Sequence, residues 1–411
     1  MRQRRVRTIV ATLGFLGIAS ALTLLIGDLS RWRRPSDPPR LSAPAPVRVG
    51  LEIPVSDEEW HKLIAKSRLD SPLSVSELLH EWRLLAAIKA AIDRLPPDER
   101  SAQPDEARCR EYEQMLGQGM CSEDKPEFKN SLFWHGPVGL CVRLKNRERG
   151  SEVDGEAHEG ELLATLAECG VPAAHRIRVD GATFSVSDLV RQTAYDYDGK
   201  TVPEFLSVGL AYHLAPASGF QNRFGRFVRF DDLMHHLTAS PLGDGTCHGT
   251  HVCYAISALL WIDSGRPFLS AECRERGRDY LVRAASRLAA TQHRDGAWRL
   301  DWPADVSTAP PAEAEADWGD AVCATGHHLE WMALYLDPPL EPRRIDLAIG
   351  FLVSRLRDQD AARIRQTYND WSHALRAITF WRGVARGRGE TESLHGTAGA
   401  THAESTKRLR G

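Results

Sequence analysis

Apolar residues recur at helical spacing from residue 51 to residue 382, and this periodicity restricts the fold more than any other feature of the chain. Capping pairs such as Ser56 with Glu59 mark several helix starts. The segment 120–154 breaks the periodicity and is expected to form a hairpin or an irregular lid. The pattern predicts no other strand, and it predicts twelve helices, near residues 57–67, 74–94, 106–118, 156–169, 185–197, 202–215, 230–239, 249–263, 271–292, 318–336, 343–358 and 370–382.

These helical segments alternate in character along the chain. Every second segment, beginning with 74–94, is apolar on most sides, which is typical of helices buried all round. Most of the others carry a face of Arg, Asp and Glu. An inner ring of six buried helices inside an outer ring of six amphipathic helices requires this alternation. The sequence therefore predicts an all-α fold, an (α/α)6 toroid of six helical hairpins over residues 51–382.

A short motif stands between an outer and an inner helix of this prediction. Residues 292–298, QHRDGAW, resemble the Gln-x-x-x-Asp-Gly-x-Trp repeat of terpenoid cyclases and prenyltransferases, with one residue fewer between Gln and Asp. The catalytic domains of that family are α/α toroids, so the resemblance implies the same fold here. The chain contains no Asp-x-Asp-Asp motif, and the resemblance therefore does not extend to the cyclase reaction.

A second motif lies at residues 326–331, GHHLEW. It is similar to the Gly-His-x-x-Glu-Trp motif of the N-acylglucosamine and cellobiose 2-epimerases, which are also toroids of six helical hairpins. In that family the motif histidine is an acid/base at a sugar carbon. The resemblance implies this role for His327, with His373 in the region where the family has its second catalytic histidine.

Histidines precede or begin four of the apolar segments. They are His158, His251, the pair His327 and His328, and His373. Inner helices of a toroid all run in the same direction, so these side chains are expected to converge. The positive end of a helix disfavours a protonated imidazole, which keeps such histidines able to accept a proton or bind a metal.

The pattern Gly-Asp-x-x-Cys-x-x-x-His occurs twice, at residues 243–251 and 319–327, and three interpretations of it stay open. Two cysteines and two histidines suit tetrahedral zinc, with Cys247, His251, Cys323 and His327 as ligands. Alternatively, the site performs acid/base catalysis without a metal. Its residues would be His251, His327, His328 and Glu330, with Asp244 and Asp320 orienting partners or a substrate hydroxyl. In the third interpretation the aspartates cap helices and the histidines are hydrogen-bonded core residues.

The N-terminus predicts a membrane anchor. Residues 1–7 contain four arginines, and residues 8–27 contain no charge and are long enough to span a bilayer as a helix. The positive-inside rule places residues 1–7 in the cytoplasm and the body outside it. We expect a single-pass protein with a transmembrane signal-anchor at 8–27, a Pro-rich linker at 28–50 and a disordered tail at 383–411. The alternative is a signal peptide that is cleaved from the mature protein.

Charge limits the choice of partner. Seven arginines and one aspartate give residues 1–34 a net charge of +6, and since the whole chain carries −3, residues 35–411 carry −9. An acidic body is a poor match for nucleic acid. We therefore expect an enzyme that uses His/Glu chemistry on a small carbohydrate-like ligand in a central cavity. The alternatives are a non-catalytic toroid that binds a ligand or a partner protein, and an isoprenoid-binding toroid similar to the terpenoid cyclases.

Overall fold

The computed structural model describes residues 55–67, 74–93, 106–120, 131–145, 155–303, 318–334 and 340–386. These ranges all belong to one of the two compact units of the chain, residues 39–411. Within them the chain forms thirteen helices and six short strands, so the fold is mostly helical, as predicted. The helices are α2 (Asp57–Lys66), α3 (Val75–Asp93), α4 (Glu106–Gly117), α5 (Glu161–Cys169), α6 (Val186–Asp196), α7 (Glu204–Leu214), α8 (Phe230–Ala239), α9 (Thr250–Gly265), α10 (Ala271–Thr291), α11 (Trp318–Leu334), α12 (Pro342–Arg357), α13 (Ala361–Gln366) and α14 (Tyr368–Arg386).

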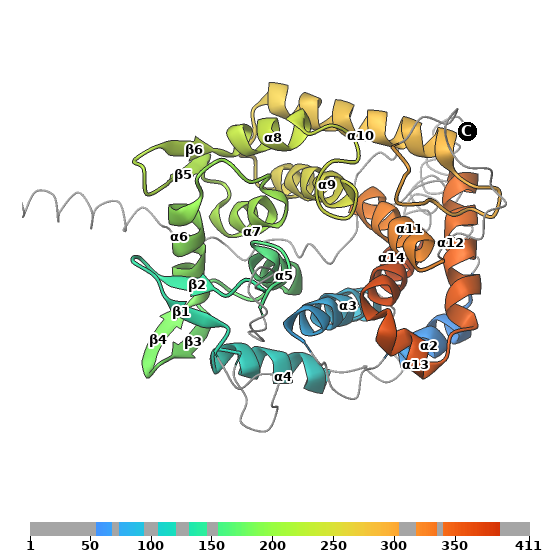
Figure 1. The fold of residues 1–411 in the computed structure, drawn as a ribbon, viewed down its shortest axis with the longest axis horizontal. Coiled ribbons are helices and arrows are strands. Elements are labelled where there is room, and N and C mark those ends of the chain that lie inside the picture. Colours follow the sequence, from blue (N-terminus) through green and yellow to red (C-terminus); the bar gives the residue numbers. More distant parts are fainter. Residues whose placement is uncertain are drawn as a thin grey trace, which may run out of the picture. The chain divides into compact units, whose positions relative to one another are not determined.

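Six of these helices close into a ring. Helix α3 packs against α5, α5 against α7, α7 against α9, α9 against α11, α11 against α14, and α14 against α3 (Figure 1). Helices α4, α6, α8, α10 and α12 pack on the outer side of this ring, and α2 and α13 both pack on α14. The inner helices are the segments that the sequence predicts to be apolar on most sides.

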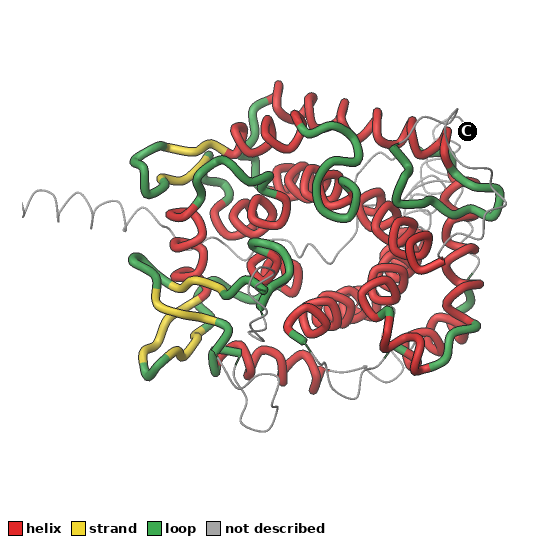
Figure 2. The backbone as a smooth tube through the Cα atoms, viewed as in Figure 1, coloured by secondary structure: helices red, strands yellow, loops and turns green. Residues whose placement is uncertain are grey.

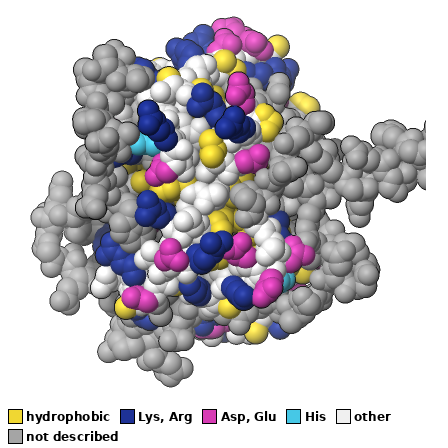
Figure 3. Space-filling view, turned by 90° about the vertical axis from the view of Figure 1, so that its right-hand side faces the viewer, with side chains coloured by type: hydrophobic (Ala, Val, Ile, Leu, Met, Phe, Trp, Pro, Cys, Tyr) yellow, Lys and Arg dark blue, Asp and Glu magenta, His cyan; other side chains and the backbone are white. Residues whose placement is uncertain are grey.

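Burial explains the difference between the inner and outer helices. In the inner helix α7, ten of the eleven residues are buried, whereas in the outer helix α10 only seven of twenty-one are. Acidic and basic side chains are interspersed on the face of the molecule shown in Figure 3. Burial on all sides drives the apolar segments into the inner ring, and the charged faces of the outer helices remain in water.

Glycine allows two pairs of inner helices to approach closely. A Cβ atom on Gly326 of α11 would lie 2.8 Å from the backbone nitrogen of Ala374 in α14. A Cβ atom on Gly209 of α7 would lie 2.6 Å from the Leu163 side chain in α5. Both distances are shorter than van der Waals contact, so the spacing of these helices requires glycine at both positions.

The 292–298 motif ties three helices together. The side-chain amide of Gln292 donates to the carbonyl oxygens of Gly296, at 3.0 Å, and Arg344 of α12, at 2.8 Å. The indole of Trp298 donates to a carbonyl oxygen of α10, and the Trp298 backbone N–H donates to the hydroxyl of Thr325 in α11. In this chain the motif therefore stabilises the packing of outer helices on inner ones.

Three antiparallel hairpins lie beside the outer helices α4, α6 and α8 (Figure 2). The first, β1 (Phe133–His135) with β2 (Leu140–Val142), falls in the segment predicted as a hairpin or lid. The other two contradict the prediction of no further strand: β3 (Arg176–Val179) pairs with β4 (Ala182–Ser185), and β5 (Gly219–Gln221) pairs with β6 (Phe227–Arg229). Each strand has only three or four residues, which is too short for alternation to be recognised.

The helix predicted at 156–169 begins five residues later than expected, at Glu161. Gly160 before it has a left-handed backbone with φ of 82°. The buried carboxyl group of Glu156 accepts hydrogen bonds from the backbone N–H groups of Gly160, at 3.0 Å, and Leu162, at 2.9 Å. The side chain of Glu156 thus caps the helix from outside it, where helical residues were expected.

None of the helices in the described ranges is both long and apolar enough to cross a membrane. The predicted n-region (1–7), transmembrane segment (8–27) and linker (28–50) lie outside those ranges. Of the predicted tail, 383–411, residues 383–386 end helix α14 and the rest lies outside the described part of the chain.

Candidate functional site

Four histidines from four inner helices meet inside the ring. His251 of α9 lies 4.7 Å from His327 of α11, and His327 lies 3.7 Å from His373 of α14, measured between ring centroids. His80 of α3 lies 4.9 Å from His373. All four are buried, and we call them the histidine cluster. His158, which was also expected to converge here, lies 5.5 Å from His251.

Glu330 of α11 connects three residues at this site. Its carboxylate accepts a hydrogen bond from Nδ1 of His373 at 3.0 Å, lies 3.3 Å from the guanidinium of Arg376 and lies 3.7 Å from Nδ1 of His327. Burial opposes ionisation of Glu330, but Arg376 and then His373 hold its pKa well below its usual range. Glu330 is therefore an ionised carboxylate that orients two imidazoles.

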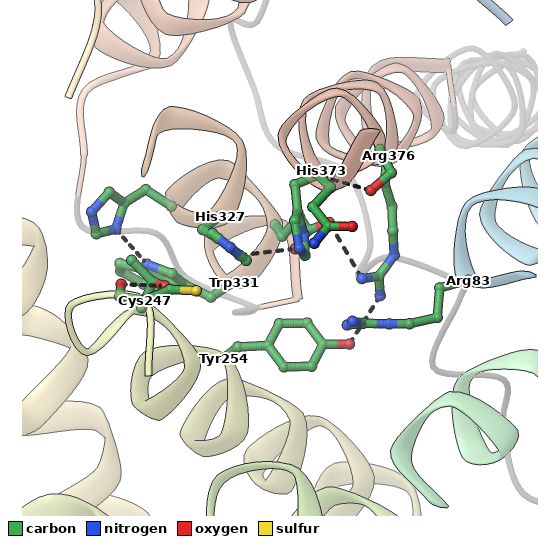
Figure 4. A network of polar contacts seen from close by, with 12 residues as sticks. Arg83, Cys247, Tyr254, His327, Trp331, His373 and Arg376 are labelled. Carbon is green, nitrogen blue, oxygen red and sulfur yellow. Dashed lines mark hydrogen bonds and ion pairs between the residues drawn. The ribbon is translucent and has the colours of Figure 1, made fainter. Parts of the chain in front are cut away.

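A network of four charges lies next to the histidine cluster. Arg83 of α3 makes two parallel hydrogen bonds to Glu168 of α5, at 2.9 and 3.0 Å, and Arg376 pairs with both Glu168 and Glu330. The hydroxyl of Tyr254 accepts a hydrogen bond from Arg376 at 3.0 Å (Figure 4). We call Arg83, Glu168, Glu330 and Arg376 the charge network. It is neutral as a whole, which makes its complete burial tolerable.

Cys247 approaches the histidine cluster from the loop before α9. Cys247 and the exposed His248 have positive φ angles, 47° and 55°. This conformation costs roughly 1–2 kcal/mol per residue outside glycine, so the surrounding contacts must hold it. The carboxylate of Glu204 accepts the Thr246 N–H at 2.8 Å, and the indole of Trp302 donates to the His248 carbonyl oxygen at 3.0 Å.

The thiol of Cys247 is acidic in these surroundings. Its neighbour Cys323, followed by His251 and His327, holds its pKa well below the usual range. Burial opposes protonation of His327, but the contacts with Cys247 and Glu330 raise its pKa to about 9. The contact with Cys247, together with burial, raises the pKa of Cys323 well above its usual range. The contact between Cys247 and His327 thus favours a deprotonated thiol and a protonated imidazole together.

Two sets of side chains here could hold a metal ion. Donor atoms of Cys247, His251 and His327 all lie within 4.8 Å of one another, and so do donor atoms of His327, Glu330 and His373. The second set is committed elsewhere, because Glu330 pairs with Arg376 and the Nε2 atom of His373 lies 3.1 Å from Nε2 of His80. The first set is the better candidate.

The structure separates some of the residues that the sequence groups together. Cys323 lies beside Cys247, and its thiol also contacts the carboxylate of Asp370. His328 points away from the histidine cluster: its Nδ1 accepts a hydrogen bond from the indole of Trp331, and its ring packs against Trp298 and Trp302. Asp244 and Asp320 are both exposed, at the loop before α9 and in the first turn of α11.

The two copies of the repeated motif have different conformations. Residues 243–249 of the first copy form a loop, and helix α9 begins at Thr250. The second copy, residues 319–327, is helical throughout, because α11 begins at Trp318. The two copies are therefore not equivalent helix starts, although His251 and His327 do face each other.

The sequence analysis missed several polar partners of this site, three of them charged. These partners are buried residues of the inner helices: His80, Arg83, Glu168, Tyr254 and Arg376. Charged residues are almost never fully buried unless paired, so an arginine or glutamate within an otherwise apolar helix signals a buried pair. The segments HEWRLLAA and ATLAEC carry that signal.

No protein-family profile, no curated protein and no solved structure matches this chain.

Proposed function

We propose that the protein is an enzyme with an (α/α)6 toroid fold, and that it exchanges a proton with a small carbohydrate-like substrate at the histidine cluster. His251 and His327 face the substrate, and Glu330 orients the imidazole of His327. The closed ring of six inner helices supports the toroid. The similarity of residues 326–331 to the 2-epimerase motif supports the substrate class, because the motif residues His327 and Glu330 both lie at this site.

The observation that carries the proposal is the state of His251. Its side chain is 6% exposed, and apart from the Cys247 thiol neither ring nitrogen has a hydrogen-bond partner within the described ranges. A buried imidazole without partners is costly, so a bound molecule is expected to supply them. An oriented imidazole beside that molecule would raise the rate of a proton transfer by roughly 10²–10⁴-fold.

The charge network distinguishes this proposal from an isoprenoid-binding toroid. The ionic side chains of Arg83, Glu168, Glu330 and Arg376 occupy the interior of the ring beside the histidines. A hydrocarbon chain placed there would face charges with which it cannot interact favourably. A polar ligand with several hydroxyl groups fits these surroundings better.

Exchange of solvent deuterium tests the proposal. The purified full-length protein is incubated with reducing sugars and N-acetylated sugars in deuterium oxide, and proton NMR follows the loss of the signal at the carbon next to the carbonyl. We expect exchange with the wild type and at least a ~100-fold loss in His327→Gln. His213→Gln is the matched control, because His213 is a buried histidine of the inner helix α7 outside this site.

A second outcome would identify the rival function. If the wild type exchanges deuterium into none of the sugars but calorimetry detects binding that His251→Gln abolishes, the protein is a non-catalytic toroid that binds a ligand. If neither exchange nor binding is detected with any sugar, the carbohydrate proposal is wrong.

We also propose that residues 8–27 anchor the protein in a membrane, with residue 51 onward outside the cytoplasm. The arginine-rich start and the uncharged run support this orientation. Protease added to spheroplasts should digest the body of the protein. Complete protection of the body while the membrane is intact would contradict the orientation.

A further inference from the structure

The donor atoms around Cys247 are arranged for a metal ion. The thiol of Cys247 and one nitrogen each from His251 and His327 lie within 4.8 Å of one another. Ligands around tetrahedral zinc, at ~2.3 Å for sulfur and ~2.0 Å for nitrogen, are separated by about 3.5 Å. The donors are therefore at most about 1.3 Å farther apart than the ligands of a bound zinc ion.

His251 and His327 each have a nitrogen available for an ion. The two ring nitrogens of His251 have no hydrogen-bond partner in the described part of the chain other than the Cys247 thiol. The Nδ1 atom of His327 faces Glu330 at 3.7 Å, which leaves Nε2 for an ion, and the His327 side chain also contacts the Cys247 thiol. Histidine ligands of metals commonly have this arrangement, with a carboxylate on the second nitrogen that fixes the tautomer.

The carboxylate beside His327 is itself held by neighbouring residues. Glu330 is held in place by the guanidinium of Arg376, at 3.3 Å, and by Nδ1 of His373, at 3.0 Å. The carboxylate that would orient the metal ligand is thus fixed by two other residues and is 1% exposed. A preorganised ligand of this kind loses little conformational entropy when it binds an ion.

We infer that Cys247, His251 and His327 bind one zinc ion and leave its fourth position open. One thiolate and two imidazoles favour zinc over magnesium and calcium, which prefer oxygen. Three protein ligands with an open position are typical of catalytic rather than structural zinc. Cys323 contacts Cys247 and Asp370 and does not belong to the set of donors that lie within 4.8 Å of one another.

This inference rests on the proposed function for the location of the substrate, and it changes the role of the imidazoles. A zinc ion with an open position lowers the pKa of bound water to about 7. In the zinc-bound protein that water would exchange the proton with the substrate, while His251 and His327 would hold the ion. Glu330 keeps the same role in both descriptions.

Metal analysis of the purified full-length protein tests the inference. The protein is equilibrated with zinc chloride and dialysed against metal-free buffer, and its zinc content is measured by inductively coupled plasma mass spectrometry. We expect one zinc per chain in the wild type and at least a tenfold lower content after dialysis in Cys247→Ser and in His251→Gln. Two controls keep the metal: His248→Asn, next to Cys247 but exposed, and Cys253→Ala, a buried thiol on α9.

Cobalt substitution gives a measurement that does not depend on the folding of any variant. Cobalt in the wild-type site should show the charge-transfer absorption of a cobalt–thiolate bond and the intense visible bands of tetrahedral coordination. A wild type that retains no metal, or binds cobalt without the thiolate absorption, would overturn the inference. Full retention of zinc by the folded Cys247→Ser protein would also overturn it.

The two proposals fail separately. A metal-free wild type that still exchanges deuterium into a sugar would refute the zinc ion and leave the proposed function intact. Stoichiometric zinc without exchange into any sugar would refute the substrate class and support the metal site.

Discussion

Replacing Glu168 by glutamine would remove one of the four charges that meet inside the ring. Glu168 is 1% exposed and pairs with both Arg83 and Arg376, so the variant leaves a net charge of +1 in the charge network without contact to water. Breaking a buried ion pair from one side costs roughly 3–5 kcal/mol. A domain has only about 5–15 kcal/mol of stability, so the Glu168→Gln variant should be severely destabilised.

A double-mutant cycle separates the pair from its surroundings. Arg83→Met alone leaves a net charge of −1 in the charge network and should lower the free energy of unfolding about as much as Glu168→Gln does. The double variant leaves Arg376 paired with Glu330, and the network is again neutral. We therefore expect the double variant to be more stable than the sum of the single costs predicts, with a coupling energy of at least ~2 kcal/mol.

Urea denaturation of the full-length protein, followed by tryptophan fluorescence, measures these differences. The control is Glu58→Gln, which breaks the exposed pair of Glu58 with Lys62, whose side chains are 79% and 70% exposed. This change should leave the free energy of unfolding almost unchanged, because water screens an exposed pair. A loss below ~1 kcal/mol in Glu168→Gln, or strict additivity in the double variant, would refute the role assigned to the charge network.

Two further variants test the packing of the ring and the cap before α5. Gly326→Ala places a Cβ atom 2.8 Å from the backbone of Ala374, where ordinary contact begins at 3.4 Å, so α14 must move by about 0.6 Å. Overpacking of this kind costs ~1–3 kcal/mol, and an unchanged thermal unfolding temperature would contradict it. Burial raises the pKa of Glu156 to about 8, so protonated Glu156 is favoured in the folded state over the unfolded state. The resulting contribution to the free energy of unfolding is complete below about pH 4.5 and is lost as the pH rises to 8. Urea denaturation should therefore show that the wild type loses more stability between pH 5 and pH 8 than the Glu156→Gln variant does. An equal change in the two proteins would disprove this role of Glu156.

The helical part of the fold can be predicted from the sequence because inner and outer helices have different patterns of apolar residues. A helix that is buried on all sides is apolar all round, whereas a helix that is buried on one side has a single apolar stripe. The hairpin β3–β4 escaped prediction although its turn carries a known signal. Asp180 and Gly181 have φ angles of 47° and 79°, and Asp-Gly between short apolar runs is typical of a two-residue hairpin turn. Strands of four residues are too short for alternation alone to reveal them.

The site was predictable where it depends on helical geometry and unpredictable where it depends on a loop. The i+3 spacing places Glu330 on the same side of α11 as His327. One position along the helix turns a side chain by about 100°, which is why His328 packs among tryptophans instead. The left-handed backbone that carries Cys247 toward the histidines depends on tertiary contacts from Glu204 and Trp302, which the spacing of the motif does not reveal.

The ring closes between its first and last inner helices, and this closure determines when the site can form. The contact of His80 with His373 spans 293 positions, and the hydrogen bond from Trp60 to Thr379 spans 319. Contacts of such long range form late and slow the folding of a chain. During synthesis, Arg83 and Glu168 must wait for α14 to leave the ribosome before the charge network is complete. Premature termination before residue 368 would therefore remove His373 and Arg376 from the site and leave an open ring with exposed apolar helices, a species prone to aggregation.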